Sequence, residues 1–137
     1  MKKIALAALL MAGVAQAETH KLAIHVDQND PAVMNLALNN AENVKSYYEG
    51  KGDDVKVEVV AYGPGLNMYL ENSPVKARLE TLGMDNSFQF SACGNTYKKM
   101  SKKAGKDLVL LPESKMVPSG VVRLMELQGE GYAYIRP

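Results

Sequence analysis

The sequence predicts an α/β fold of three layers, a mostly parallel sheet of five strands with helices on both faces. Short runs rich in β-branched residues alternate along the chain with longer segments whose apolar residues recur every three or four positions. Strands and helices that alternate in this way form parallel pairs joined by right-handed crossovers. A chain of 137 residues suits one domain with a single core.

The first strand is expected at residues 21–26, where polar and apolar side chains alternate. Asp30 and Pro31 predict a helix start, because an N-cap carboxylate accepts free N–H groups and proline fits the first helical position. The helix is expected to end near Glu49, before two glycines. Its apolar stripe consists of Met34, Ala37, Leu38, Ala41, Val44 and Tyr48.

The second strand is expected at residues 55–61, where the β-branched run becomes continuous as in a buried strand. A sharp loop must follow at residues 62–65, which read YGPG. Ser73 and Pro74 repeat the helix-start signal, so the second helix is expected from there to Gly83.

The third strand is expected to turn Phe88, Phe90 and Ala92 towards the core. Asn95 then predicts the N-cap of a third helix, which ends near Gly105.

The segment after that helix leaves two alternatives open. Residues 108–111 form a buried strand, or they form a turn that leads to a short strand at 115–117. Pro118 and Ser119 open a fourth helix, and the final strand is expected at residues 132–135.

The first 17 residues predict a secretory leader. Two lysines precede an apolar run at residues 4–14, and Ala-Gln-Ala follows, ending at Ala17. The run is too short to span a bilayer. We therefore expect cleavage after Ala17, export to a bacterial periplasm, and a single domain over residues 18–137.

The charge balance excludes some classes of partner. The formal charge of the chain is +1, and loss of Lys2 and Lys3 with the leader changes it to −1. We therefore expect no binding to nucleic acid and no association with a membrane after cleavage. A single cysteine also rules out an internal disulfide.

That cysteine, Cys93, is the expected catalytic residue. It stands between a strand and a helix, where free N–H groups and the helix dipole favour a thiolate. Gly94, Asn95 and Thr96 at the helix start are expected to bind the anionic sulfur. The alternative is that Cys93 is a small buried hydrophobic residue.

The helix after Cys93 carries five lysines: Lys98, Lys99, Lys102, Lys103 and Lys106. They provide a positive field that attracts anions and lowers the pKa of the thiol, or they form a solvated helix face.

Further binding residues are expected where strands end, because ligands bind beyond the carboxyl ends of parallel strands. These residues are His25, Asp27, Gly63, Pro64 and Gly65. His25 is a candidate base for the thiol, or a hydrogen-bonded residue without a chemical role.

Asn39 belongs to a row of asparagines on the first helix, which predicts a ligand contact, a subunit interface or a solvated face. No metal-ligand or phosphate-loop motif occurs, and the Gly63–Gly65 loop lacks the third glycine of a dinucleotide site. No cofactor and no metal are therefore expected.

Several stretches together resemble the DsrE/DsrF-like sulfur-relay superfamily, and in particular its exported branch. They are HVDQNDPAVMNLALNN from His25, VVAYGPG from Val59, ACGNTYKKM from Ala92, VPSGVVRLMELQ from Val117 and GYAYIRP from Gly131. The resemblance implies a homo-oligomer, a trimer or hexamer, and a persulfide on a cysteine after the third strand, the position of Cys93.

The leading hypothesis is therefore a periplasmic sulfur carrier or sulfurtransferase-like protein. Its expected partners are small sulfur donors and acceptors or thiol proteins. Two alternatives stay open, a non-catalytic oligomeric binding module of the same fold and a thiol redox sensor.

Overall fold

The computed structural model of the protein describes residues 13 and 15–137. The expected leader at residues 1–17 lies mostly outside these residues. The described elements are β1 (Thr19–Val26), α1 (Pro31–Glu49), β2 (Asp54–Ala61), the 3-10 helix η1 (Gly63–Tyr69), α2 (Lys76–Leu82), β3 (Phe88–Cys93), α3 (Gly94–Ala104), β4 (Ser114–Val117), α4 (Gly120–Gly129) and β5 (Ala133–Ile135).

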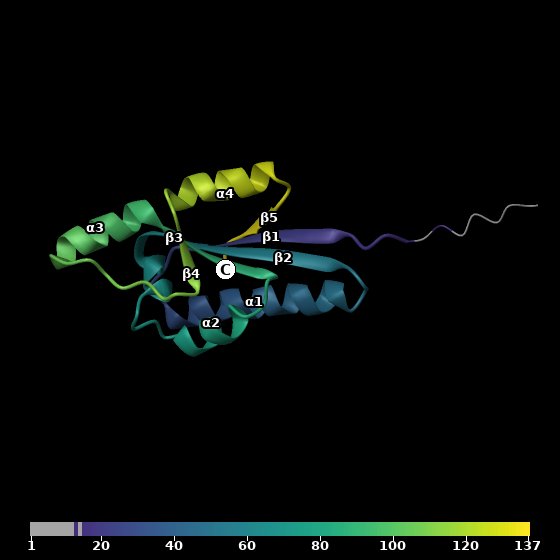
Figure 1. Cartoon of the computed structure of the whole chain (residues 1–137), viewed down its shortest axis with the longest axis horizontal. Coiled ribbons are helices and arrows are strands. Elements are labelled where there is room, and N and C mark those ends of the chain that lie inside the picture. Colours follow the sequence, from purple (N-terminus) through teal and green to yellow (C-terminus); the bar gives the residue numbers. More distant parts are fainter. Residues whose placement is uncertain (1–12, 14) are drawn as a thin grey trace, which may run out of the picture.

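The five strands form one sheet in the order β4-β3-β2-β1-β5, and every pairing between them is parallel. Figure 1 shows α1 and α2 on one face of the sheet and α4 on the other, while α3 projects beyond one edge. The three-layer α/β fold predicted from the sequence is confirmed, with a sheet that is parallel throughout. Among the described residues, no helix has the length and apolar character needed to cross a bilayer.

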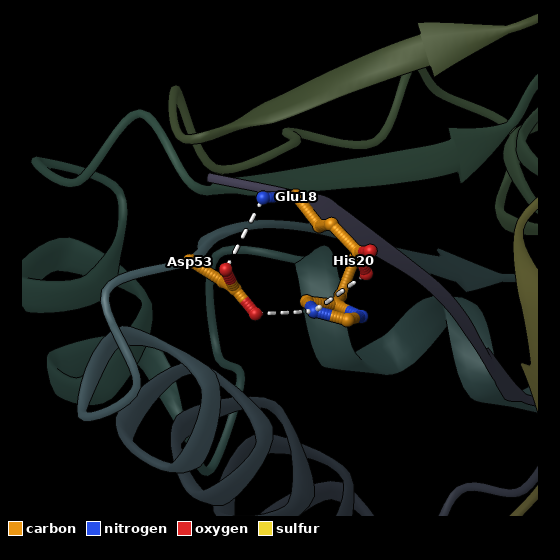
Figure 2. A group of neighbouring side chains, drawn as sticks. All are labelled: Glu18, His20 and Asp53. Carbon is orange, nitrogen blue, oxygen red and sulfur yellow. Dashed lines mark hydrogen bonds and ion pairs between the residues drawn. The ribbon is translucent and has the colours of Figure 1, made fainter. Parts of the chain in front are cut away.

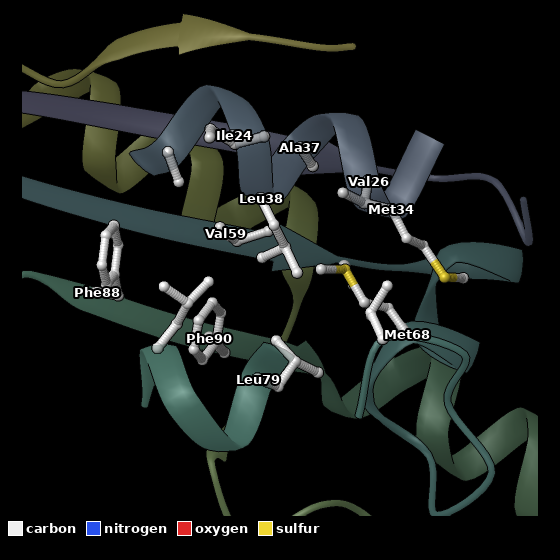
Figure 3. Packing of buried hydrophobic residues seen from close by; sticks show 14 of the residues in the cluster. Ile24, Val26, Met34, Ala37, Leu38, Val59, Met68, Leu79, Phe88 and Phe90 are labelled. Atoms are coloured by element: carbon white, nitrogen blue, oxygen red, sulfur yellow. The ribbon is translucent and has the colours of Figure 1, made fainter. Parts of the chain in front are cut away.

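Each face of the sheet is covered by its own hydrophobic cluster. The larger one lies beneath α1 and α2, where Figure 3 shows strand and helix side chains in contact, among them Ile24, Val59, Phe90, Leu38 and Leu79. The smaller one lies under α4 and contains Ala23, Val60, Leu124 and Leu127. Neighbouring residues of a strand point to opposite faces, so strands covered on both faces are apolar at nearly every position.

One charged side chain is buried on the α4 face. Glu58 of β2 is 3% exposed, and Arg123 of α4 donates to both of its carboxylate oxygens, from Nε at 2.6 Å and from Nη2 at 2.8 Å. The Ser91 hydroxyl donates to the same carboxylate at 3.0 Å. This pair ties α4 to the middle of the sheet.

Two helices begin as the sequence predicts. Asp30 caps α1 by accepting the Ala32 N–H at 2.8 Å, and α1 ends at Glu49. Ser119 caps α4 by accepting the Val122 N–H at 3.5 Å. For residues 107–117 the second alternative is correct, because residues 108–111 lead by turns into the short strand β4.

Two predicted helix starts are wrong. The Ser73 hydroxyl accepts the Val75 N–H within a turn, and α2 begins only at Lys76. The N-cap of α3 is Cys93 instead of Asn95, because β3 runs into the helix without a loop. Asn95 therefore lies inside the first turn of α3.

Candidate active site at the carboxyl edge of the sheet

The carboxyl ends of the central strands meet at one edge of the sheet. Val26 pairs with Ala61, and Ala61 pairs with Ala92, so the segments that follow these strands start side by side. Figure 1 shows η1 and the first turns of α3 and α4 gathered at this edge.

Cys93 ends β3 and caps α3. Its side chain is buried, with 4% of the residue exposed, yet it belongs to neither hydrophobic cluster. The start of α4 lies beside it, because a Cβ on Gly120 would stand 3.2 Å from the Cys93 Cβ. The thiol therefore lies near the N-terminal ends of two helices, whose partial positive charges favour a thiolate.

The surroundings of Cys93 change the pKa of its thiol in opposite directions. Burial has the largest single effect and raises the pKa, because it disfavours the charged form. The Thr96 hydroxyl and the backbone N–H groups of Thr96, Gly120 and Asn95 stabilise the thiolate and together outweigh burial. The net pKa of Cys93 is below its ordinary value, which increases the thiolate fraction near neutral pH.

Gly94 provides space at this junction. A Cβ there would lie 2.9 Å from the carbonyl oxygen of Val117, the residue that pairs with Cys93 on β4. Only glycine lets α3 start this close to the end of β4.

His25 lies near the end of β1 and is 4% exposed. Its Nδ1 shares a hydrogen bond of 2.8 Å with the Tyr134 hydroxyl, and its ring meets the edge of Tyr62 at a centroid distance of 4.3 Å. The Nε2 atom is buried without a hydrogen-bond partner among the described residues. Burial lowers the pKa of His25, the Asp27 charge raises it and the Arg136 charge lowers it, so the imidazole is neutral at pH 7.

Tyr62 connects His25 to the thiol. Its Cβ lies next to Gly120, which also touches Cys93, while its ring contacts the imidazole. The one hydrogen bond of the His25 side chain within the described chain goes to Tyr134. His25 thus has two tyrosine neighbours, Tyr62 and Tyr134.

The Gly63–Gly65 loop is the start of η1 and is held to both neighbouring elements. The Gly63 N–H donates to the Thr96 hydroxyl at 2.9 Å. A Cβ on Gly65 would overlap the Val26 carbonyl oxygen, so this residue allows the close approach to β1. Pro64 is exposed between them.

A groove of about 850 Å³ opens between this loop and α3. Its lining includes Gly63, Pro64, Thr96, Lys99 and Lys103. Thr96 lies both on this groove and next to the thiol. All five lysines of the segment are exposed, and none forms an ion pair with a described carboxylate, so the groove has a positive border.

Most of the residues singled out from the sequence lie at this edge. They are Cys93, Gly94, Asn95, Thr96, His25, Asp27, Gly63, Pro64 and Gly65. Asn39 does not lie at this edge. It is exposed on α1, which covers a face of the sheet. In the same row, Asn35 accepts a hydrogen bond of 2.9 Å from Arg78, so this residue has a structural contact.

Sequence reasoning missed three residues of the edge: Gly120, Tyr134 and Arg136. Arg136 pairs with Asp27 at 3.5 Å, and Tyr134 holds His25. The Pro-Ser-Gly helix start at residues 118–120 was the available signal for Gly120. Nothing local signals the two C-terminal residues, because they reach the site through the pairing of β5 with β1.

A separate group of side chains lies at the opposite, amino end of β1. Figure 2 shows Glu18, His20 and Asp53, whose oxygen and nitrogen ligand atoms all lie within 4.8 Å of one another. His20 Nε2 is 2.9 Å from Asp53 Oδ2 and 4.0 Å from Glu18 Oε2. One imidazole and two carboxylates are side chains of the kind that bind metal ions. The sequence does not reveal this group, because Asp53 is 33 residues from His20.

Comparison with known proteins agrees with the fold. MTH1491, a protein of unknown function from Methanobacterium thermoautotrophicum, has a structure similar to this chain, with a TM-score of 0.72 and 30% sequence identity over 86% of this chain and 99% of that one. No curated protein matches the sequence. A family match extends over residues 2–137, a range that includes most of the expected leader. The chain belongs to the DsrE/DsrF-like family.

Proposed function

We propose that the protein is a sulfur carrier that holds sulfane sulfur as a persulfide on Cys93 and passes it to an acceptor thiol. The observation that carries the proposal is the position of this thiol near the N-terminal ends of α3 and α4, with a lowered pKa. Sulfur relay is the general role of the family. A thiolate is the form of cysteine that attacks sulfur.

The transfer takes place in two displacements. With thiosulfate as donor, the Cys93 thiolate attacks the sulfane sulfur, an S–S bond forms on Cys93, and sulfite leaves with the electron pair of the broken bond. An acceptor thiolate then attacks the terminal sulfur of the persulfide, and the Cys93 thiolate leaves. No external oxidant or reductant is needed, because each step exchanges one bond to the same sulfur atom.

Neighbouring groups have separate roles in this proposal. The Thr96 hydroxyl and the N–H groups of Asn95 and Gly120 stabilise the thiolate and the persulfide anion formed from it. The groove beside Thr96 receives the donor or the acceptor, and Lys99 and Lys103 on its border attract anions. Suitable partners are small anionic sulfur compounds and thiol proteins with an acidic surface.

Export completes the proposal. Cleavage after Ala17 and release into the periplasm would place residues 18–137 in an oxidising compartment, where a persulfide or a mixed disulfide is a stable storage form. We also propose a homo-oligomer, a trimer or hexamer, on the family resemblance. Light scattering of the purified protein would measure its mass in solution.

The test is a sulfur-loading experiment on the purified protein. After incubation with thiosulfate or polysulfide, the intact mass should increase by one sulfur atom, and dithiothreitol should remove it. The Cys93→Ser variant is the matched control and should gain nothing. A wild-type protein that reacts with an alkylating reagent yet gains no sulfur would contradict the proposal.

The groove supports a second candidate, a non-catalytic binding module. Most of its lining belongs to η1 and α3, and Cys93 is not part of it. In this case Cys93→Ala would leave both ligand affinity and oligomer size unchanged, whereas the carrier hypothesis predicts that it abolishes sulfur loading.

A further inference from the structure

The amino end of β1 gains a free amine when the leader is cleaved. This step rests on the proposed export. Hydrolysis of the Ala17–Glu18 peptide bond leaves Glu18 with a free α-amino group, and the chain then begins Glu18-Thr19-His20. Histidine occupies the third position of the new N-terminus.

A chain with histidine at its third position offers four nitrogen atoms in one plane. They are the α-amine, the amide nitrogens of the second and third residues, and Nδ1 of the histidine. Square-planar coordination is typical of Cu(II) and Ni(II). We propose that the cleaved protein binds one Cu(II) ion at Glu18-Thr19-His20. Binding displaces one proton from the α-ammonium group and one from each of the two amides.

Asp53 holds the His20 ring through the nitrogen that the chelate leaves free. Nε2 lies 2.9 Å from Asp53 Oδ2, as Figure 2 shows. Nδ1, the nitrogen that closes the chelate, has no hydrogen-bond partner among the described residues. A carboxylate that accepts from the second ring nitrogen orients a ligating histidine and makes it a stronger ligand. The ring is also stacked on Tyr48, at a centroid distance of 3.6 Å.

The same carboxylate holds the other end of the chelate. The Glu18 backbone nitrogen, which becomes the α-amine, donates to Asp53 Oδ1 at 3.1 Å. Asp53 thus contacts both the backbone nitrogen of Glu18 and the ring of His20, the two residues that carry the first and last nitrogen donors of the site.

The start of β1 can be released without disturbing a core. β5 pairs with β1 only from Leu22 onward, so Thr19 and His20 have a strand neighbour on one side only. Glu18 and Thr19 are exposed, and neither hydrophobic cluster includes any of the three residues. Metal binding therefore competes only with the first rungs of the β1–β2 ladder.

The test uses protein that begins at Glu18, obtained by cutting a fusion protein directly before that residue. Every described strand and helix lies within residues 19–135, so this chain keeps the fold. A Cys93→Ser background removes the thiol, which also binds copper, and separates this test from sulfur loading. Titration with Cu(II) alone should give one ion per chain and the violet absorption band of a planar four-nitrogen complex.

Three variants give the controls. Retention of Ala17 moves histidine to the fourth position and should abolish the violet complex, as should His20→Ala. Asp53→Asn should keep the band and lower the affinity about 10- to 100-fold, because it removes the contacts of the carboxylate with His20 and Glu18 and none of the four nitrogen donors.

Equal affinity and an identical spectrum in the chain that retains Ala17 would overturn the proposal and assign the copper to the side chains of Glu18, His20 and Asp53. Absence of binding in the chain that begins at Glu18 would also overturn it. N-terminal sequencing of the exported protein tests the cleavage separately, and a different first residue would remove the site from the natural protein.

Discussion

Replacing Thr96 by valine should raise the pKa of Cys93. The Thr96 hydroxyl is the first of the groups that lower this pKa, after the opposing effect of burial. Valine keeps the branched shape and the backbone N–H of residue 96, so the thiolate loses only the hydroxyl. Because the hydroxyl also accepts the Gly63 N–H at 2.9 Å, the variant should lose about 1 kcal/mol of stability as well.

The magnitude follows from the strength of a hydrogen bond to a charged group. Such a bond contributes about 1.5–3 kcal/mol, and 1.36 kcal/mol corresponds to one pKa unit. The pKa of Cys93 should therefore rise by about one to two units in Thr96→Val. Thr96→Ser is the matched control, because serine keeps the hydroxyl and should leave the pKa near the wild-type value.

The pKa is measured from the ultraviolet absorbance of the thiolate as a function of pH, with Cys93→Ser as the baseline. The free energy of unfolding should also differ between wild type and Thr96→Val. A thiol whose pKa is lower in the folded state than in the unfolded state stabilises the fold only at alkaline pH. Wild type should gain stability over Thr96→Val as the pH rises through the folded-state pKa of wild type, and the gain should be complete once the pH also exceeds the folded-state pKa of the variant, because the unfolded thiol titrates alike in both chains. Identical titrations of the valine and serine variants would refute this account of the thiolate.

Three further predictions concern the fold around the site. Gly65→Ala should lower the free energy of unfolding in urea by about 3 kcal/mol or more, because the new Cβ overlaps the backbone of β1. Gly63→Ala is the control: its Cβ meets no atom, so the free energy of unfolding should fall by only about 1–2 kcal/mol, the cost of the positive φ of 54°. Arg123→Met should destabilise the protein by about 3–5 kcal/mol at pH 7, because it leaves Glu58 buried without its partner. The double variant Arg123→Met with Glu58→Leu should recover most of that stability, and no recovery would contradict the ion-pair explanation. Lowering the pH from 7 to 5 should destabilise wild type more than His25→Gln in urea unfolding. The lowered pKa keeps His25 neutral in the folded state, whereas the unfolded chain takes up a proton below about 6.5. Equal pH dependence of the two proteins would show that His25 does not contribute.

The sequence predicts those parts of the fold that depend on neighbours in the chain. The Asp30 cap, the apolar stripe of α1 and the end of that helix near Glu49 follow from local patterns, and all three are confirmed. The Asn95 cap fails because cap preference describes a helix that follows a loop, whereas β3 passes directly into α3. The predicted helix start at Ser73 is wrong for a related reason, because the chain makes a turn before α2 begins.

The candidate site is predictable as far as parallel topology determines it. Strand ends must share an edge, which is enough to bring His25, the Gly63–Gly65 loop and Cys93 together. The order of the strands is not encoded locally, so the sequence does not reveal that β5 lies beside β1 and carries Tyr134 to His25. Asn39 belongs to a periodic row, and such a row marks a helix face but contains no information about distance from the thiol.

The contact between His25 and Tyr134 joins residues that are 109 positions apart, and it involves the first and last strands of the sheet. Tyr134 is synthesised 109 residues after His25, so a nascent chain cannot form this contact until β5 has left the ribosome. Long-range strand pairing of this kind also forms slowly. In the export proposed above, the chain would cross the membrane unfolded, and this late and slow pairing would delay assembly of the thiol edge until β5 has arrived.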